Sequence, residues 1–269
     1  MIHSPLPSPM ITSPQNPKLK LVRALMGRAK ERRAESAFIA EGVRLVEEAA
    51  NSNWGFRFVL YDETLNERGK LNVKRLTSLG VECDEIPSSL MKSLSDTETS
   101  QGILAVLQLT QLPVTNYPTF LLIPDQIRDP GNLGTLIRSA DAAGVDAMLI
   151  PPETTDPFAP KTVRAGMGAH FRLPIHAMGW EDMAGRFAGL QVYLADMNGQ
   201  SYWDADLRQP LALIVGGEAE GASESARKLA SQRIKIPMAG RTESLNAAVA
   251  GSVLMFEVMR QRTSGKPKN

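Results

Sequence analysis

The stretch IPMAGRTESLNAAVAGSVLMFE, residues 236–257, decides the fold of the C-terminal half of this chain. It opens with a polar cluster, Thr242, Glu243, Ser244 and Asn246, and continues with the small residues Ala247, Ala248, Ala250 and Gly251. We expect Pro237 to end a strand and Ser244 to cap a helix that starts at Leu245. Small residues let another backbone or a flat ligand approach closely. Helix packing in a core explains the alanines but not the polar residues beside them.

Short apolar runs precede this stretch. They are TFLLI (119–123), DAMLI (146–150), QVYLADM (191–197), LALIVGG (211–217) and RIKIPM (233–238). Several alternate with helical stretches, which is typical of a parallel sheet covered on both faces. Two prolines interrupt QLTQLPVTNYP (108–118), so this segment is a connector that marks a domain boundary. The sequence therefore predicts an α/β domain after the connector.

The N-terminal half, residues 16–109, mixes helix and strand. FIAEGVRLVEEA (38–49) predicts a strand followed by a helix, and FRFVLY (56–61) predicts a short strand. A helix begins earlier, with Asn16 as its cap and Pro17 in its first turn. The other face of this helical region is basic and carries Lys18, Lys20, Arg23, Arg28, Lys30, Arg32 and Arg33. These seven side chains face one acid, Glu31, and the local charge of +6 suits either an RNA backbone or a solvated surface.

Composition narrows the class of protein. The 269 residues are 43% hydrophobic and 22% charged, with a net charge of +1, so nucleic-acid affinity must come from local clustering. With Cys83 as the single cysteine, a disulfide within the chain is excluded and the reducing cytoplasm is favoured. Three histidines add too little for a metal site, and we expect no metal. Residues 1–15 are rich in Pro and Ser, which predicts a disordered leader, and no apolar run is long enough for a membrane span.

A second segment that carries candidate functional residues is DQIRDPGNLGTLIRSADAAGVDAMLI, residues 125–150. A turn leads into a helix that Gly144 closes, and Asn132 and Arg138 lie off its apolar stripe. Asn132 would then stand at a helix N-terminus beyond the end of a strand, where open α/β sheets bind ligands. The alternative makes Asn132 a cap and Arg138 a partner of Asp141.

The third segment, LALIVGGEAEGASESARKLA (211–230), runs from a strand into a glycine-rich turn. A dinucleotide site would need glycine at position 218, but Glu218 stands there and its carboxylate would repel a pyrophosphate. Glycines beside Glu218 and Glu220 suit a ligand without phosphate that is positively charged or donates hydrogen bonds. The alternative is a turn with solvated acids.

In this order and at these spacings, the three segments resemble the motifs of the SpoU/TrmH family of RNA ribose 2′-O-methyltransferases, within the SPOUT superfamily. The matching stretches are NLGTLIR (132–138), GGEAEG (216–221) and IPMAGRTESLNAAVA (236–250). The N-terminal half is similar to the family's L30e-like α/β substrate-binding domain, through FIAEGVRLVEEA and SQGILA (100–105). Composition predicts the leader over 1–15 and the linker over 110–118, and the resemblance implies an RNA-binding domain over 16–109 and a methyltransferase domain over 119–269.

For the second domain, the resemblance implies a deep trefoil knot, which the general rule against knots would exclude. It also implies that S-adenosylmethionine binds in the knot and that active sites form at a homodimer interface. The cofactor would contact Gly216, Ile236, Met238 and Leu245. The catalytic pocket would contain Asn132, Arg138, Glu218, Ser244 and Asn246. The chain departs from the family pattern at Ala219, where glycine is common, and at Gly166, where serine is common.

The expected substrate is a structured RNA. The resemblance favours large-subunit (23S) ribosomal RNA, with tRNA as the second choice. A non-catalytic RNA-binding or ribosome-assembly protein with the same fold is the main rival. A dehydrogenase is disfavoured by Glu218, and a serine hydrolase by the absence of a G-x-S-x-G motif.

Overall fold

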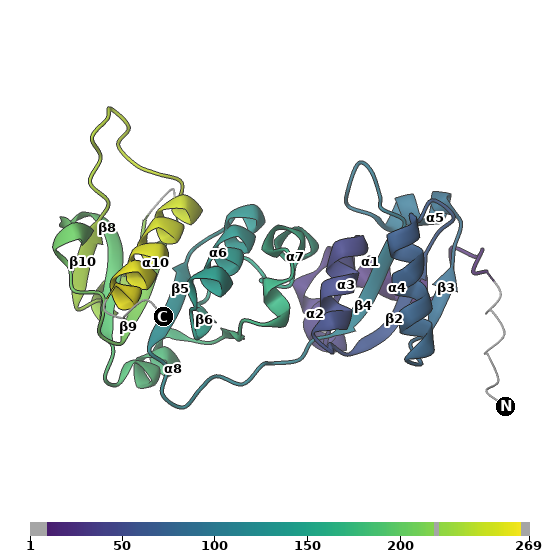
Figure 1. The fold of residues 1–269 in the computed structure, drawn as a ribbon, viewed down its shortest axis with the longest axis horizontal. Helices are drawn as coiled ribbons and strands as arrows, with labels where there is room; N and C mark the ends of the chain where they lie inside the picture. The colour runs from purple at the N-terminus through teal and green to yellow at the C-terminus, as the bar shows by residue number, and fades with distance from the viewer. Residues whose placement is uncertain (1–9, 218–220, 265–269) are drawn as a thin grey trace. The chain divides into compact units, whose positions relative to one another are not determined.

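The computed structural model describes residues 10–217 and 221–264. The chain divides into two compact units (Figure 1). The first contains the residues up to Thr110 together with Phe158–Phe171, and the second contains Gln111–Pro157 and the residues from Arg172 onward. Each unit has its own sheet. No helix within the described ranges combines the length and the apolar character that a membrane span requires.

The first unit is built on a four-stranded sheet in the order β1-β4-β2-β3. Its strands are β1 (Ala37–Glu41), β2 (Phe56–Tyr61), β3 (Cys83–Glu85) and β4 (Ile103–Gln108). Its helices are α1 (Pro17–Gly27), α2 (Ala29–Glu35), α3 (Val43–Asn51), α4 (Glu67–Ser78), α5 (Ser88–Leu94) and α7 (Pro160–Gly166). The predicted strand–helix pair and the strand at 56–61 are confirmed. Asn16 caps α1, since its side chain accepts a hydrogen bond from the Lys18 amide at 2.8 Å.

The predicted disordered leader is wrong for residues 10–15. The Ile11 amide donates to the Glu85 carbonyl at 2.9 Å, and the Ile11 side chain packs against the core of the first unit. β3 is an edge strand, so the backbone at its end has groups to offer the incoming chain. One apolar residue in a Pro/Ser-rich stretch is therefore enough to anchor it. Residues 1–9 lie outside the described residues.

Residues 158–171 belong to the first unit, whereas the sequence placed them in the second domain. The reason is aromatic packing. The ring of Phe38 on β1 lies 5.0 Å from that of Phe158 and 6.4 Å from that of Phe171, between ring centroids. Trp54 packs on Phe171 at 5.4 Å. Burying large aromatic surfaces stabilises this arrangement, and local sequence patterns do not report it.

The second unit holds a six-stranded, all-parallel sheet in the order β10-β8-β9-β5-β6-β7. Its strands are β5 (Phe120–Asp125), β6 (Ala147–Ile150), β7 (Ile175–Ala177), β8 (Gln191–Ser201), β9 (Leu211–Gly216) and β10 (Gln232–Lys235). Its helices are α6 (Pro130–Ala143), α8 (Trp180–Ala184), α9 (Glu224–Leu229) and α10 (Ala247–Thr263). The predicted parallel sheet is confirmed. β7 was not predicted, because three residues are too few to show a period.

Helices cover both faces of this sheet. Successive side chains of β9 contact the helix layers on opposite faces of the sheet, because neighbouring side chains of a strand point to opposite faces. Ile214 packs with Met183 of α8 and Ala226 of α9 in one apolar cluster. Val215, the next residue, lies against Gly251 of α10. The predicted two-sided cover is therefore confirmed.

The small residues of α10 allow it to lie directly beside α6 (Figure 1). A Cβ atom on Gly251 would lie 2.5 Å from Cδ2 of Leu136 and 3.2 Å from Cγ2 of Val215, so no larger residue fits without movement. The Ser252 hydroxyl also donates to the Ser139 hydroxyl at 2.8 Å. Close helix packing thus explains Gly251.

The entry to α10 differs from the prediction. The preceding strand ends at Lys235 rather than Pro237, and the helix begins at Ala247 with Asn246 as its N-cap. The Asn246 side-chain oxygen accepts from the amides of Ala248 at 3.0 Å and Val249 at 3.2 Å. Asn and Ser cap helices about equally well, so the sequence could not choose between Ser244 and Asn246.

Candidate functional site

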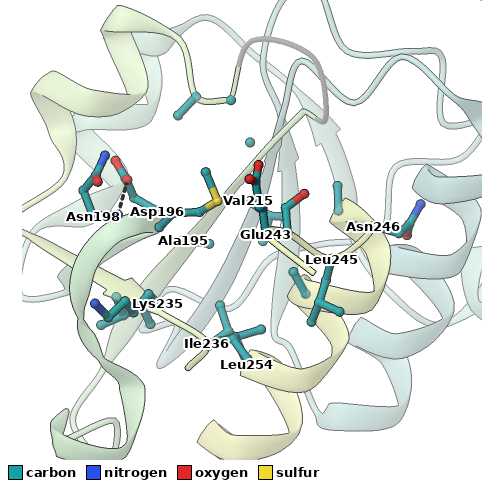
Figure 2. A pocket seen from close by; sticks show the side chains of 18 of the residues that line it. Ala195, Asp196, Asn198, Val215, Lys235, Ile236, Glu243, Leu245, Asn246 and Leu254 are labelled. Atoms are coloured by element: carbon teal, nitrogen blue, oxygen red, sulfur yellow. Dashed lines mark hydrogen bonds between the residues drawn. The ribbon is translucent and has the colours of Figure 1, made fainter. Parts of the chain in front are cut away.

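A cavity of about 900 Å³ opens in the second unit where β8, β9 and β10 approach the start of α10. Ligands of open α/β sheets usually bind outside the carboxyl ends of the strands, and this cavity lies there. Its volume is in the range of small-molecule sites. Figure 2 shows Asp196 and Asn198 on one side of it and Leu245 and Asn246 on the opposite side.

Six of the predicted site residues line this cavity: Gly216, Ile236, Met238, Ser244, Leu245 and Asn246. They include all four residues expected to contact a cofactor. Glu218, which was expected in the catalytic pocket, lies outside the described residues, as does Ala219. The cavity therefore joins the second and third motif segments, which are far apart in sequence.

Gly216 ends β9 where the chain folds back on itself. A Cβ atom at this position would lie 2.7 Å from the amide nitrogen of Ala222, which is closer than real contacts allow. A glycine at the end of a buried strand thus lets two backbone segments form one wall of the cavity, without side chains in the way. This wall exposes backbone groups, which can hydrogen-bond a ligand.

Charges of both signs line the cavity. Asp196 and Glu243 carry carboxylates, while Arg227 and Lys235 are basic. Asp196 is held in place, because its Oδ1 accepts from the Asn198 amide at 2.9 Å and its Oδ2 lies 3.5 Å from Nη1 of Arg233. The sequence motifs did not predict this acidic side. Its position at the end of the apolar run QVYLADM was the available signal, because parallel strands present their carboxyl ends to the site.

Apolar side chains complete the lining. Met238 is 37% exposed and Leu245 is 36% exposed, which leaves apolar surface open to the cavity. S-adenosylmethionine combines a flat adenine, a sulfonium, an ammonium and a carboxylate. A cavity with apolar surface, both signs of charge and exposed backbone fits that combination.

Asn132 joins the site through a hydrogen bond with Asn246. Its Oδ1 accepts from Nδ2 of Asn246 at 3.0 Å, across 114 residues of sequence. The alternative that made Asn132 a helix cap is wrong, because Asp129 caps α6. The Asp129 side chain accepts a hydrogen bond from the backbone N–H of Asn132 at 2.8 Å. The Asn132 side chain is therefore directed to the start of α10 and not to its own helix end.

Arg138 is exposed on α6 and is not among the residues that line the cavity. Its proposed alternative partner is also wrong, because Asp141 pairs instead with Arg172, with Oδ2 2.9 Å from Nη2. Arg138 forms no hydrogen bond or ion pair with any residue in the described ranges. The structure thus brings Asn132, Ser244 and Asn246 to the cavity side of the unit and leaves Arg138 apart from them.

The basic face of the first unit is smaller than the sequence suggested. Lys18 is ion-paired with Asp84 and lies 2.6 Å from a carboxylate oxygen of Glu82. Arg32 is only 4% exposed and donates to the Leu25 carbonyl at 2.5 Å. These two side chains stabilise the fold, so they are not available to bind an RNA phosphate. The exposed members are Lys20, Arg23, Arg28, Lys30 and Arg33.

Gly166, the departure from the family pattern in the first unit, lies against a buried histidine. A Cβ atom at this position would lie 2.4 Å from Cε1 of His170, which is 1% exposed. A serine at position 166 would therefore need the imidazole to move. The two residues depend on each other for space.

No group of three or more His, Cys, Asp or Glu side chains in the described part of the chain is arranged to hold a metal ion.

Comparisons with known proteins agree with this geometry. A model of the SpoU rRNA methylase family matches residues 119–256, and a model of the MRM3-like substrate binding domain matches residues 16–105. The chain is 34% identical over 252 residues to the Bacillus subtilis (strain 168) 23S rRNA (guanosine(2553)-2'-O)-methyltransferase RlmP, covering 92% of this chain and 98% of that protein. It is 32% identical over 271 residues to the Streptomyces viridochromogenes 23S rRNA (uridine(2479)-2'-O)-methyltransferase, covering 95% of this chain and 93% of that protein.

The fold also matches solved structures. The AdoMet-bound rRNA methyltransferase from Sinorhizobium meliloti superimposes with a TM-score of 0.82 at 32% sequence identity, over 93% of this chain and 97% of that chain. The family model covers more than half of the 269 residues, and the relatives match almost from end to end. This chain belongs to the SpoU rRNA methylase family.

Proposed function

We propose that this protein transfers the methyl group of S-adenosylmethionine to a ribose 2′-hydroxyl of 23S ribosomal RNA. The observation that carries the proposal is the cavity, which gathers the second and third motif segments in one wall and contacts the first through the Asn132–Asn246 hydrogen bond. Relatives with at least 30% identity are named as 23S rRNA 2′-O-methyltransferases, and a matching structure is described as AdoMet-bound. Those names support the same chemistry here.

The cofactor would be held by Gly216, Ile236, Met238 and Leu245, with the backbone of the β9 end on one side. We also propose that the second unit is tied in a deep trefoil knot and that the first has an L30e-like fold, as in the family. The sheet order supports the knot, because β10 lies beside β8 and the chain after β10 returns to the cavity formed by the ends of β8 and β9.

The bound cofactor supplies an electrophilic methyl group, and the protein must align a hydroxyl with it. Asn132 and Asn246 are fixed to each other and can orient the ribose from the cavity edge. A guanidinium holds its proton too tightly to act as the base. Arg138 therefore stabilises the developing alkoxide or holds a phosphate, while water or a substrate phosphate takes the proton. Glu218 and Ser244 complete the proposed pocket.

The site requires a second copy of the chain. Arg138 lies away from its own cavity, yet the proposed chemistry needs its charge there. α10 carries an apolar stripe in which Val249 is 48% exposed and Phe256 is 41% exposed, seven residues and two turns apart on one face. Exposed apolar helix faces of this kind mark interfaces. We propose a homodimer through this face, in which Arg138 of one subunit serves the cavity of the other.

The first unit would bind the RNA. Its exposed basic residues on α1 and α2 can contact phosphates, and such contacts position the RNA without reading its sequence. The free thiol of Cys83 fits a reducing compartment, and we propose the cytoplasm.

The test uses purified protein, radiolabelled S-adenosylmethionine and two substrates, 23S ribosomal RNA and tRNA that lack the modification. We expect label in 23S RNA, at one position that resists alkaline cleavage. Asn132→Ala should lose the label. Asn51→Ala should keep it, because Asn51 lies in the first unit, where its side chain accepts a hydrogen bond from Arg75 at 2.7 Å. Label in tRNA alone would correct the substrate. No label in either RNA would favour the non-catalytic RNA-binding alternative.

A further inference from the structure

Asp125, the last residue of β5, carries a fully buried carboxylate, and one of its oxygens accepts a hydrogen bond. It is 0% exposed and lies in register with Gly216 of β9. Its Oδ2 accepts from the Ser223 amide at 2.6 Å, whereas its Oδ1 is buried without a hydrogen-bond partner among the described residues. Burying a carboxylate with so few hydrogen bonds costs stability. A group of this kind calls for a role beyond packing.

The residue after Asp125, Gln126, lies against the same segment. Gln126 has a left-handed backbone with φ of 55°, which is strained for a residue with a side chain. Its carbonyl oxygen lies 2.5 Å from where a Cβ atom of Gly217 would stand. Two consecutive residues therefore hold the chain that leaves β9 at Gly217 and the chain that enters α9 at Ser223. A backbone bridge between Gly217 and Gly221 brings these two limbs together.

Both limbs form the cavity wall. Gly216, Gly217, Gly221 and Ala222 line the cavity, whereas Asp125 itself does not. Asp125 can thus influence a ligand only through the backbone it holds. We propose that Asp125 is a positioning residue that fixes the limbs between β9 and α9 in the shape that binds the cofactor. The inference rests on the proposed function only for the identity of that ligand.

The chain offers a matched control at the opposite end of the same strand. Asp146 Oδ2 accepts from the amides of Thr119 at 2.6 Å and Phe120 at 2.9 Å, at the start of β5. Asp146 also holds backbone amides through a carboxylate, but it lies at the edge of the sheet that is remote from the cavity. Its loss should affect stability without affecting the ligand.

The experiment compares Asp125→Leu, Asp125→Asn and Asp146→Leu. Leucine has the same branching as aspartate but no acceptor, whereas asparagine keeps an acceptor for the Ser223 amide. We expect Asp125→Leu to raise the Kd for S-adenosylmethionine about tenfold or more in isothermal titration calorimetry, and the other two variants to stay within about twofold of wild type. Thermal melts record the loss of stability separately.

A second pair removes the donor instead of the acceptor. Ser223 has φ of −64°, which proline adopts, so Ser223→Pro deletes the amide hydrogen without changing that angle. Ser223→Ala keeps the amide but loses the side-chain cap on Ala226. We expect Ser223→Pro to bind the cofactor as weakly as Asp125→Leu and Ser223→Ala to bind it as wild type does. This pair keeps the test valid if Asp125→Leu does not fold.

Hydrogen exchange measured without ligand separates this inference from the proposed function. Peptides that cover residues 221–226 should exchange faster in Asp125→Leu and Ser223→Pro than in wild type, and unchanged in Asp146→Leu. If wild type does not bind S-adenosylmethionine, the proposed function fails while this exchange still tests Asp125. Unchanged exchange together with unchanged affinity in Asp125→Leu and Ser223→Pro would overturn the positioning role.

Discussion

The Nδ2 atom of Asn246 donates a hydrogen bond to Oδ1 of Asn132 at 3.0 Å, so the first residue before α10 is tied to the first turn of α6. The same Asn246 side chain caps α10 with its oxygen. One amide therefore performs two tasks with its two ends: the oxygen supports the fold, and the nitrogen joins two of the family motifs at the cavity. These tasks can be separated by mutation.

Asn246→Asp should keep the cap and lose the hydrogen bond that Nδ2 donates to Asn132. A carboxylate accepts from the amides of a first helical turn as well as an amide oxygen does, but it has no hydrogen to donate. We expect near wild-type thermal stability with methyl transfer reduced about tenfold or more. Asn246→Ala loses both the helix cap and the hydrogen bond to Asn132, so its free energy of unfolding should also fall by about 1 kcal/mol. Equal activity in Asn246→Asp and wild type would show that the hydrogen bond donated by Asn246 to Asn132 does not serve catalysis.

Arg138→Lys should retain measurable methyl transfer, and Arg138→Ala should lose it. Lysine keeps a positive charge but lacks the planar fork of the guanidinium, so it can stabilise an alkoxide less well. Single-turnover methylation assays measure the difference, with cofactor and RNA binding checked separately. Complete loss of activity in Arg138→Lys with both ligands still bound would contradict a purely electrostatic role.

Mixed dimers test whether the site is shared between subunits. Arg138→Ala and Gly216→Val should each be inactive alone, the second because a side chain at position 216 collides with the Ala222 amide. If Arg138 serves the cavity of the partner, half of the dimers in an equal mixture carry one intact site, and activity recovers to about a quarter of wild type. No recovery, with mixed dimers verified by mass spectrometry, would place Arg138 and the cavity of the same subunit in one site.

The exposed basic residues should set the salt dependence of RNA binding. Lys20→Ala should reduce the slope of log affinity against log salt by about 1, because one phosphate contact is lost. Lys18→Ala should leave the slope unchanged and lower thermal stability, since Lys18 is committed to Asp84 and Glu82. Lys74→Ala, on the exposed surface of α4 in the same unit, is the control. A slope that changes equally in all three variants would assign no RNA contact to the basic face.

Asp125 should make stability depend on pH. Burial raises the pKa of its carboxyl group, although the hydrogen bond from Ser223 and the charge of Arg227 oppose this, and Glu153 adds to it. Because the folded state favours the protonated form, the stabilising contribution is full below the unfolded pKa and is lost as pH rises through the folded pKa. Wild type should therefore lose stability relative to Asp125→Asn as the pH rises above the ordinary range of an aspartate pKa, about 3.9. A melting-temperature difference that stays constant as the pH rises would contradict the burial effect.

Local patterns in the sequence predicted most elements of the second unit. TFLLI, DAMLI and LALIVGG overlap β5, β6 and β9, because short apolar runs between turn residues suit buried parallel strands. The turn at Asp129 and the closing Gly144 bounded α6 correctly, since cap and C-terminal chemistry act within one turn of the helix. The motif segments also identified six of the residues that line the cavity. The strands and the helix bounds could be predicted because they depend on patterns among residues close in sequence.

The sequence alone determined the α/β class, the family and six of the residues that line the cavity. Only the tertiary structure decided that Lys18 and Arg32 serve the fold, that residues 158–171 pack with Phe38 and Trp54, and that Asn246 rather than Ser244 caps α10. It also placed Asp125 against Ser223, 98 residues away. The ion pair of Lys18, the packing of residues 158–171 and the contact of Asp125 depend on partners distant in sequence, and a period of two or 3.6 residues carries no information about such partners. The choice between Asn246 and Ser244 depends on where the chain enters the helix, which two equally good caps do not decide.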